Sequence, residues 1–171
     1  MSLYPKNIEH KIGFDEIRRF VSNNCCCDLG KQKINEIAFL TDTDEIEALL
    51  HQTMEMMEII RTNNDFPTPS FATIYDAITR IRPEGTYLTT NELHTLRKSI
   101  IEIQSVLLFF NKQKETYPYL AKLAEPIVIA TEICKIIDSV ISPNGTLKDN
   151  ASPKLVEIRH DIAQKRRAIN K

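Results

Sequence analysis

The feature that most constrains the fold is a long amphipathic stretch in the middle of the chain. Residues 89–92, Thr-Thr-Asn-Glu, form a capping-box pattern, in which the threonine accepts a backbone hydrogen bond and the glutamate reaches back. Apolar residues then recur every three or four positions, at Leu93, Leu96, Ile100, Ile103, Leu107 and Phe110. This period is that of an α-helix with one apolar face. We expect the helix to end near residues 112–114 and to lie at the centre of a bundle.

The rest of the chain shows helical spacing over shorter intervals. The expected helices cover residues 5–12, 14–23, 28–39, 44–62, 74–82, 117–124 and 131–141. Proline makes residues 63–70 a loop, and residues 126–130 are an extended connector, because a single short strand has no partner. The expected fold class is therefore all-α, a multi-helix bundle.

Three of these helices have a predicted buried face. In residues 28–39 it consists of Leu29, Ile34 and Ile37. In residues 44–62 it consists of Ile46, Leu49, Thr53, Met57 and Ile60. In residues 131–141 it consists of Ile133, Ile136, Ile137, Val140 and Ile141.

The last helix has a clear start and no stop signal. Ser152 offers a hydroxyl as N-cap, and Pro153 suits the first helical position, where its missing N–H costs nothing. Its apolar seam is narrow, which favours packing against one partner helix. The seam residues are Leu155, Ile158, Ile162 and Ile169. We expect this helix to leave the body of the domain, and the chain to be the front part of a longer protein.

The same helix carries most of the excess positive charge. The whole chain has a net charge of −1, but residues 153–171 have a local net charge of +4, which leaves −5 on the first 152 residues. Such a segment attracts phosphates in a salt-sensitive way, although a charge run is usually a solvated coiled-coil surface. The candidate nucleic-acid contacts are Arg159, Lys165, Arg166, Arg167 and Lys171.

Other chemistry has weak support in the sequence. Glu157 and His160 have the spacing found in di-metal carboxylate bundles, but such sites need a second motif and two further glutamates. The four histidines lie on separate predicted helices and are expected to be surface or cap residues. Four glycines cannot build a phosphate loop. We predict no catalytic, metal or cofactor residues in these 171 residues.

The cysteines and the hydropathy indicate the compartment. Cys25, Cys26 and Cys27 are adjacent and Cys134 is distant, which is not the spacing of a disulfide framework. We expect structural thiols, with reactive or metal-binding thiols as the alternative. There is no apolar run long enough for a membrane span and no signal segment. These features predict a cytoplasmic protein without membrane contact.

Two segments resemble the second bacterial MutS family, the MutS paralogue that lacks the mismatch-reading domains and often carries an Smr endonuclease domain. Residues 12–18, Ile-Gly-Phe-Asp-Glu-Ile-Arg, with Leu-Gly-Lys at 29–31, look like the opening of that family. Residues 148–155, Lys-Asp-Asn-Ala-Ser-Pro-Lys-Leu, with Ile158 and Arg159, resemble its entry into the long lever helix. Between them Gly85, Leu88, Glu92 and Leu93, Asp138 and Gly145 occur in the expected order. The cysteine triplet departs from the family pattern.

The resemblance implies a helical core domain at residues 1–151 and the start of a lever or clamp helix at 152–171, which continues beyond the chain. It implies a non-catalytic segment of a dimeric DNA-binding ATPase that acts in DNA mismatch repair or in suppression of recombination. ATP and Mg²⁺ would bind elsewhere in the full-length protein, which would also carry the endonuclease activity. Branched or mismatched DNA is the implied partner, and the ribosome is the partner for some family members. The alternatives are a self-contained helical protein-interaction module and a di-metal helical enzyme.

Overall fold

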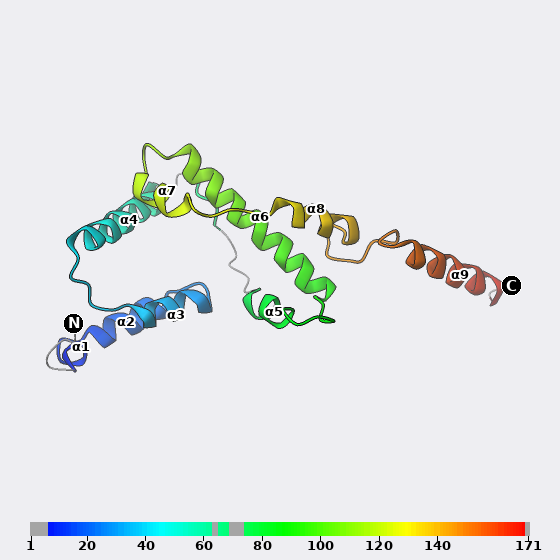
Figure 1. Cartoon of the computed structure of the whole chain (residues 1–171), viewed down its shortest axis with the longest axis horizontal. Helices are drawn as coiled ribbons and strands as arrows, with labels where there is room; N and C mark the ends of the chain where they lie inside the picture. Colours follow the sequence, from blue (N-terminus) through cyan, green and yellow to red (C-terminus); the bar gives the residue numbers. More distant parts are fainter. Residues whose placement is uncertain (1–6, 63–64, 69–73, 170–171) are drawn as a thin grey trace. The chain divides into compact units, whose positions relative to one another are not determined.

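The structure is a computed structural model that describes residues 7–62, 65–68 and 74–169, and the regular elements of this part are helices (Figure 1). The helices are α1 (Ile8–Lys11), α2 (Phe14–Asn23), α3 (Asp28–Glu36), α4 (Thr43–Thr62), α5 (Tyr75–Arg80), α6 (Thr90–Lys112), α7 (Pro118–Ala124), α8 (Thr131–Val140) and α9 (Pro153–Ile169). The predicted all-α fold class is confirmed. Of the described helices, none is both long and apolar enough to cross a bilayer.

The described residues divide into two compact units. The first contains residues 7–51, and the second contains residues 52–62, 65–68 and 74–169. The boundary falls inside α4, between His51 and Gln52. The predicted boundary between a helical core at residues 1–151 and a lever helix from residue 152 is a different division, and it stays a prediction.

In the first unit, the Arg18 side chain joins three helices. Its guanidinium donates to the carbonyl oxygens of Ile34, at 2.5 Å, and Ile37, at 3.1 Å, and to the Glu9 carboxylate of α1, at 3.1 Å. The guanidinium carbon lies 5.2 Å from the centre of the Phe14 ring. Arg18 thus binds the carbonyl of Ile34, which also accepts the Ile37 N–H at 3.4 Å, and the carbonyl of Ile37 just beyond the end of α3.

This arrangement explains why α3 is shorter than predicted. The helix ends at Glu36 because Ile37 adopts an extended conformation, with φ −57° and ψ 125°, so the predicted end at residue 39 is wrong. Leu29 and Ile37, which were predicted to be buried, are exposed. Helices α1, α5 and α8 also end one or two residues before the predicted ends. Residues 5 and 6, the predicted start of the first helix, lie outside the described residues.

In the second unit, a core forms where α4, α6 and α7 meet. Its buried residues are Ile59, Phe110, Tyr117 and Ala121. Phe66, in the segment 65–68, covers one side of this core and packs edge-on against Phe109, with ring centres 5.2 Å apart. Figure 1 shows α7 folding back beside the end of α6, as the contacts between the two helices require.

The buried face of α4 differs from the predicted one. Met57 and Ile60 are exposed, whereas Ile59 is buried and Met56 packs against the core. The prediction followed one apolar stripe along the whole helix. The prediction was wrong because Met56 and Ile59, in the last two turns of α4, pack at the core that contains Tyr117 and Ala121. Apolar residues lie on more than one side of α4, and the sequence does not show which side contacts another helix.

Glu55, on the same side of α4 as Ile59, fixes the start of α7. Its carboxylate oxygens accept hydrogen bonds from the backbone N–H groups of Tyr119, at 3.0 Å, and Leu120, at 2.8 Å. No side chain near Tyr117 caps this helix start. Glu55 therefore provides from another helix what an N-cap residue usually provides locally.

An ion pair links α6 to α8. The Arg97 guanidinium donates to both carboxylate oxygens of Asp138, one of them at 3.3 Å. In α8, Ile137 is buried and so is Ile141, which follows the helix, whereas Ile133 and Ile136 are exposed. The predicted inward face of this helix is thus correct at its C-terminal end and wrong at its start, where no described helix covers it.

The predicted capping box at the start of α6 is confirmed. The Glu92 N–H donates to the Thr89 hydroxyl at 3.3 Å, and the Glu92 carboxylate accepts from the Thr89 N–H at 2.8 Å and from the Arg80 guanidinium at 2.7 Å. The Thr89 N–H, followed by Arg80 and the Thr89 hydroxyl, lowers the pKa of Glu92 from 4.5 to about 2. The charged carboxylate thus stabilises the folded state.

This shift gives a pH-dependent test with Glu92→Gln. Because the folded pKa lies below the unfolded one, the stabilisation is present above pH 4.5 and is lost as pH falls towards about 2. The variant should be less stable than the wild type at neutral pH, and the difference should shrink between these two values. Urea denaturation followed by circular dichroism measures it. Glu84→Gln, at an exposed turn position, is the control, and a difference that does not change with pH would contradict the assignment.

Candidate nucleic-acid interface

The turn that precedes α9 is held by its own backbone and by α6. The Ser142 N–H donates to the Thr146 carbonyl at 2.8 Å, and the Lys148 N–H donates to the Val140 carbonyl at 2.9 Å. Gly145 has φ +80°, and a Cβ there would lie 3.2 Å from the His94 ring of α6. Both the backbone conformation and the close approach therefore favour glycine at this position.

Asp138 connects this turn to the rest of the second unit. Its carboxylate pairs with Arg97 of α6, and its backbone carbonyl accepts a hydrogen bond from the Lys148 ammonium at 2.5 Å. An antiparallel bridge between Ile141 and Leu147 closes the same turn. The segment that leads into α9 is thus tied to both α6 and α8.

The predicted start of α9 is confirmed. The Leu155 N–H donates to the Ser152 hydroxyl at 3.2 Å, and Pro153 is the first helical residue. The predicted apolar seam of the helix is covered only in part. Leu155 is half-buried, but Ile158 and Ile162 are 45% and 46% exposed, and no described helix packs along α9.

The candidate basic residues fall into two groups. Arg159 forms an ion pair with Asp149, which lies in the turn before α9, and its charge is partly neutralised. In the last described turns of α9, Lys165, Arg166 and Arg167 are exposed and have no acidic partner among the described residues. Lys171 lies outside the described residues. The structure brings three of the five residues onto one short stretch of helix without a counter-charge.

The candidate metal pair and the histidines occupy four separate helices. Glu157 and His160 are both exposed on α9, and within the described ranges no group of three or more His, Cys, Asp or Glu side chains is placed to hold a metal ion.

His10 lies on the surface, where its hydrogen bond with the Asp15 carboxylate raises the pKa of the imidazole. His94 was predicted to be a surface or cap residue. It instead packs against Gly145, and its Nδ1 is buried.

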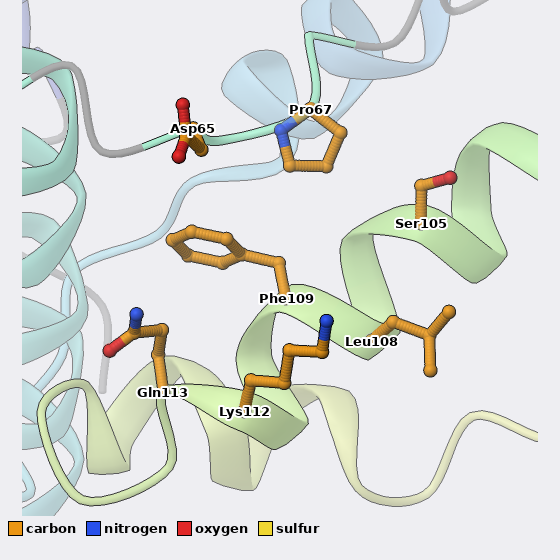
Figure 2. Close-up of a pocket in the computed structure, with 7 residues that line it drawn as sticks. All are labelled: Asp65, Pro67, Ser105, Leu108, Phe109, Lys112 and Gln113. Atoms are coloured by element: carbon orange, nitrogen blue, oxygen red, sulfur yellow. The ribbon is translucent and has the colours of Figure 1, made fainter.

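A shallow pocket on α6 was not predicted. It has a volume of about 520 Å³ and lies between the segment 65–68 and the C-terminal half of α6. Figure 2 shows the Phe109 ring extending from α6 towards the segment that carries Asp65 and Pro67, with Lys112 and Gln113 below the ring. Among the described residues, the pocket lining contains no His, Cys or Tyr. Helical periodicity places Phe109 beside the apolar face, but the pocket also depends on residues 65–68, which lie 41 to 44 positions earlier in the sequence.

Comparisons with known proteins point to one group of relatives. The chain is 25% identical to "Endonuclease MutS2" of Alkaliphilus oremlandii over 158 residues, which are 91% of this chain and 20% of that protein. Identity is 24% over 156 residues to the protein of the same name from a Geobacillus species, and 28% over 162 residues to that of Staphylococcus saprophyticus. These alignments cover 90% and 91% of this chain and 20% of each relative.

The chain therefore spans about a fifth of the length of the curated relatives it matches. No protein-family model matches the chain, and no solved structure matches it significantly.

The contact of α9 with nucleic acid stays a prediction, and its salt dependence is measurable. Removal of a single phosphate contact lowers the slope of log K against log salt by about 0.9. Replacement of Lys165, Arg166 and Arg167 by glutamine should therefore reduce the slope for duplex DNA by roughly 2 to 3. Arg159→Gln should reduce it less, because Asp149 already pairs with that guanidinium.

Fluorescence anisotropy with a labelled duplex over a series of salt concentrations measures these slopes. Lys122→Gln, at an exposed position of α7, is the matched control and should leave the slope unchanged. A triple variant with the wild-type slope would exclude Lys165, Arg166 and Arg167 as DNA contacts.

Proposed function

We propose that this chain is the N-terminal part of the core and lever region of a MutS2-type protein, and that it is a non-catalytic helical segment of a DNA-binding ATPase. The observation that carries this proposal is the similarity to proteins named Endonuclease MutS2 over about 90% of the chain. The segment around Ser152 supports it, because this segment resembles the entry into the lever helix.

The proposed task of the segment is mechanical. A lever needs a fixed base and a stiff arm, and the contacts around Asp138 supply a base for α9. The 17 residues of α9 make an arm about 25 Å long at the usual rise per residue. A displacement of α6 and α8 would then move the far end of α9, where the unpaired basic residues lie.

The full-length protein would supply the remaining chemistry. ATP and Mg²⁺ would bind outside these 171 residues, and two copies of the protein would form the DNA clamp. The proposed role is in DNA repair or in suppression of recombination through branched DNA. A family member that acts on the ribosome would use the same lever on ribosomal RNA, since phosphate contacts of α9 do not distinguish the two.

A second candidate function is a helical module that binds a partner protein. The exposed apolar residues of α9 favour it, because Ile158, Ile162 and Ile169 lie along one seam without a described partner. In this case α9 would pair with a helix of another protein and would transmit no nucleotide-dependent movement.

Two variants at one position of the full-length protein distinguish these functions. Gln164 lies away from both ends of α9, and its side chain is exposed to solvent. Gln164→Pro should therefore break the helix, at a cost of about 3 kcal/mol, while Gln164→Ala should preserve it. The lever proposal predicts that the proline variant keeps its basal ATP hydrolysis but loses stimulation by branched DNA. The alanine variant should retain both activities.

Stimulation that survives Gln164→Pro would contradict the lever role. The same assay with ribosomes in place of DNA distinguishes the two nucleic-acid partners. If Gln164→Pro abolished binding of a partner protein but left ATP hydrolysis and its stimulation unchanged, the interaction module would be favoured.

A further inference from the structure

The cysteine triplet forms the connection between α2 and α3, and two of its thiols face the same space. Cys25 follows the end of α2, and Cys27 is the N-cap residue of α3. A Cβ built on Gly30 would lie 3.5 Å from the Cys25 sulfur and 3.6 Å from the Cys27 sulfur. Both sulfur atoms therefore lie at van der Waals contact distance from one point beside Gly30. Cys26 is exposed, whereas Cys25 and Cys27 are half-buried.

A backbone N–H and a lysine ammonium lie at the start of α3, the helix that Cys27 caps. The Gly30 N–H, in the first turn of α3, donates to the Cys27 sulfur at 3.4 Å. The Lys31 ammonium is held beside the helix start by Asp28, at 3.0 Å, and the pKa of Lys31 is raised chiefly by that carboxylate and also by the two thiols. The Cys27 sulfur thus accepts a backbone N–H at the start of α3, the end of a helix at which negative charge is favoured.

We propose that Cys25 and Cys27 form a two-thiolate site for a soft monovalent metal ion, with Cu(I) as the chemical class of ligand. Thiolate sulfur is the ligand type that Cu(I) selects, and two sulfur ligands satisfy its linear coordination. Binding replaces two S–H bonds by two S–Cu bonds and releases two protons, with no change of oxidation state. The product carries one negative charge, which the Gly30 N–H and Lys31 stabilise.

The two cysteine positions allow the site to be removed while the fold is kept. Serine is a favoured N-cap residue, so Cys27→Ser keeps the acceptor for the Gly30 N–H. Cys25→Ser keeps a hydroxyl donor for the Val21 carbonyl, which the thiol contacts at 3.5 Å. Cys26→Ser and Cys134→Ser are the matched controls, because each removes one thiol outside the proposed site.

Anaerobic titration of the reduced chain with Cu(I), in competition with a chromophoric Cu(I) chelator, tests the proposal. The wild type should bind one Cu(I) per chain as a monomer, and X-ray absorption should report two sulfur ligands. Cys25→Ser and Cys27→Ser should each abolish this complex, whereas Cys26→Ser and Cys134→Ser should retain it. Binding that persists in either of the first two variants, disappears with Cys26→Ser, or links two chains through one metal ion would overturn the proposal.

Discussion

The core of the second unit depends on one carboxylate, that of Glu55. The seven residues of α7 make a helix too short to be stable in isolation, and its first residue is a proline without an N–H. The next two N–H groups have no partner within the helix, and both donate to Glu55 of α4. A negative charge at this end of a helix also interacts favourably with its dipole. Without Glu55, the chain after Tyr117 would have no fixed start for the helix that buries Ala121.

A continuous series of contacts leads from this cap towards α9. Because α7 is held by α4, Tyr117 and Ala121 pack against Phe110 near the end of α6. From α6, Arg97 pairs with Asp138, whose carbonyl holds Lys148 ahead of the last helix. The proposed lever would thus rest on side-chain contacts that join helices distant in sequence.

Local signals in the sequence predicted helix starts better than helix partners. Thr89 and Ser152 cap helices through residues three positions away, so their patterns are visible in sequence. The cap at α7 joins residues 64 and 65 positions apart, and nothing near Tyr117 indicates it. The same limit explains the wrong face predicted for α4 and the unpredicted pocket beside Phe109. The basic residues of α9 were predictable because charge is local, but the pairing of Arg159 with Asp149 was not.

Glu55 holds the start of α7 and thereby stabilises the core beside it, and Glu55→Ala tests this dependence most directly. Removal of two hydrogen bonds to a charged group should lower the free energy of unfolding by about 1–2 kcal/mol. Hydrogen exchange at the Tyr119 and Leu120 amides should become faster. Glu58→Ala, one turn further along α4 with an exposed side chain, should change neither quantity. Unchanged protection of these two amides in Glu55→Ala would contradict the account.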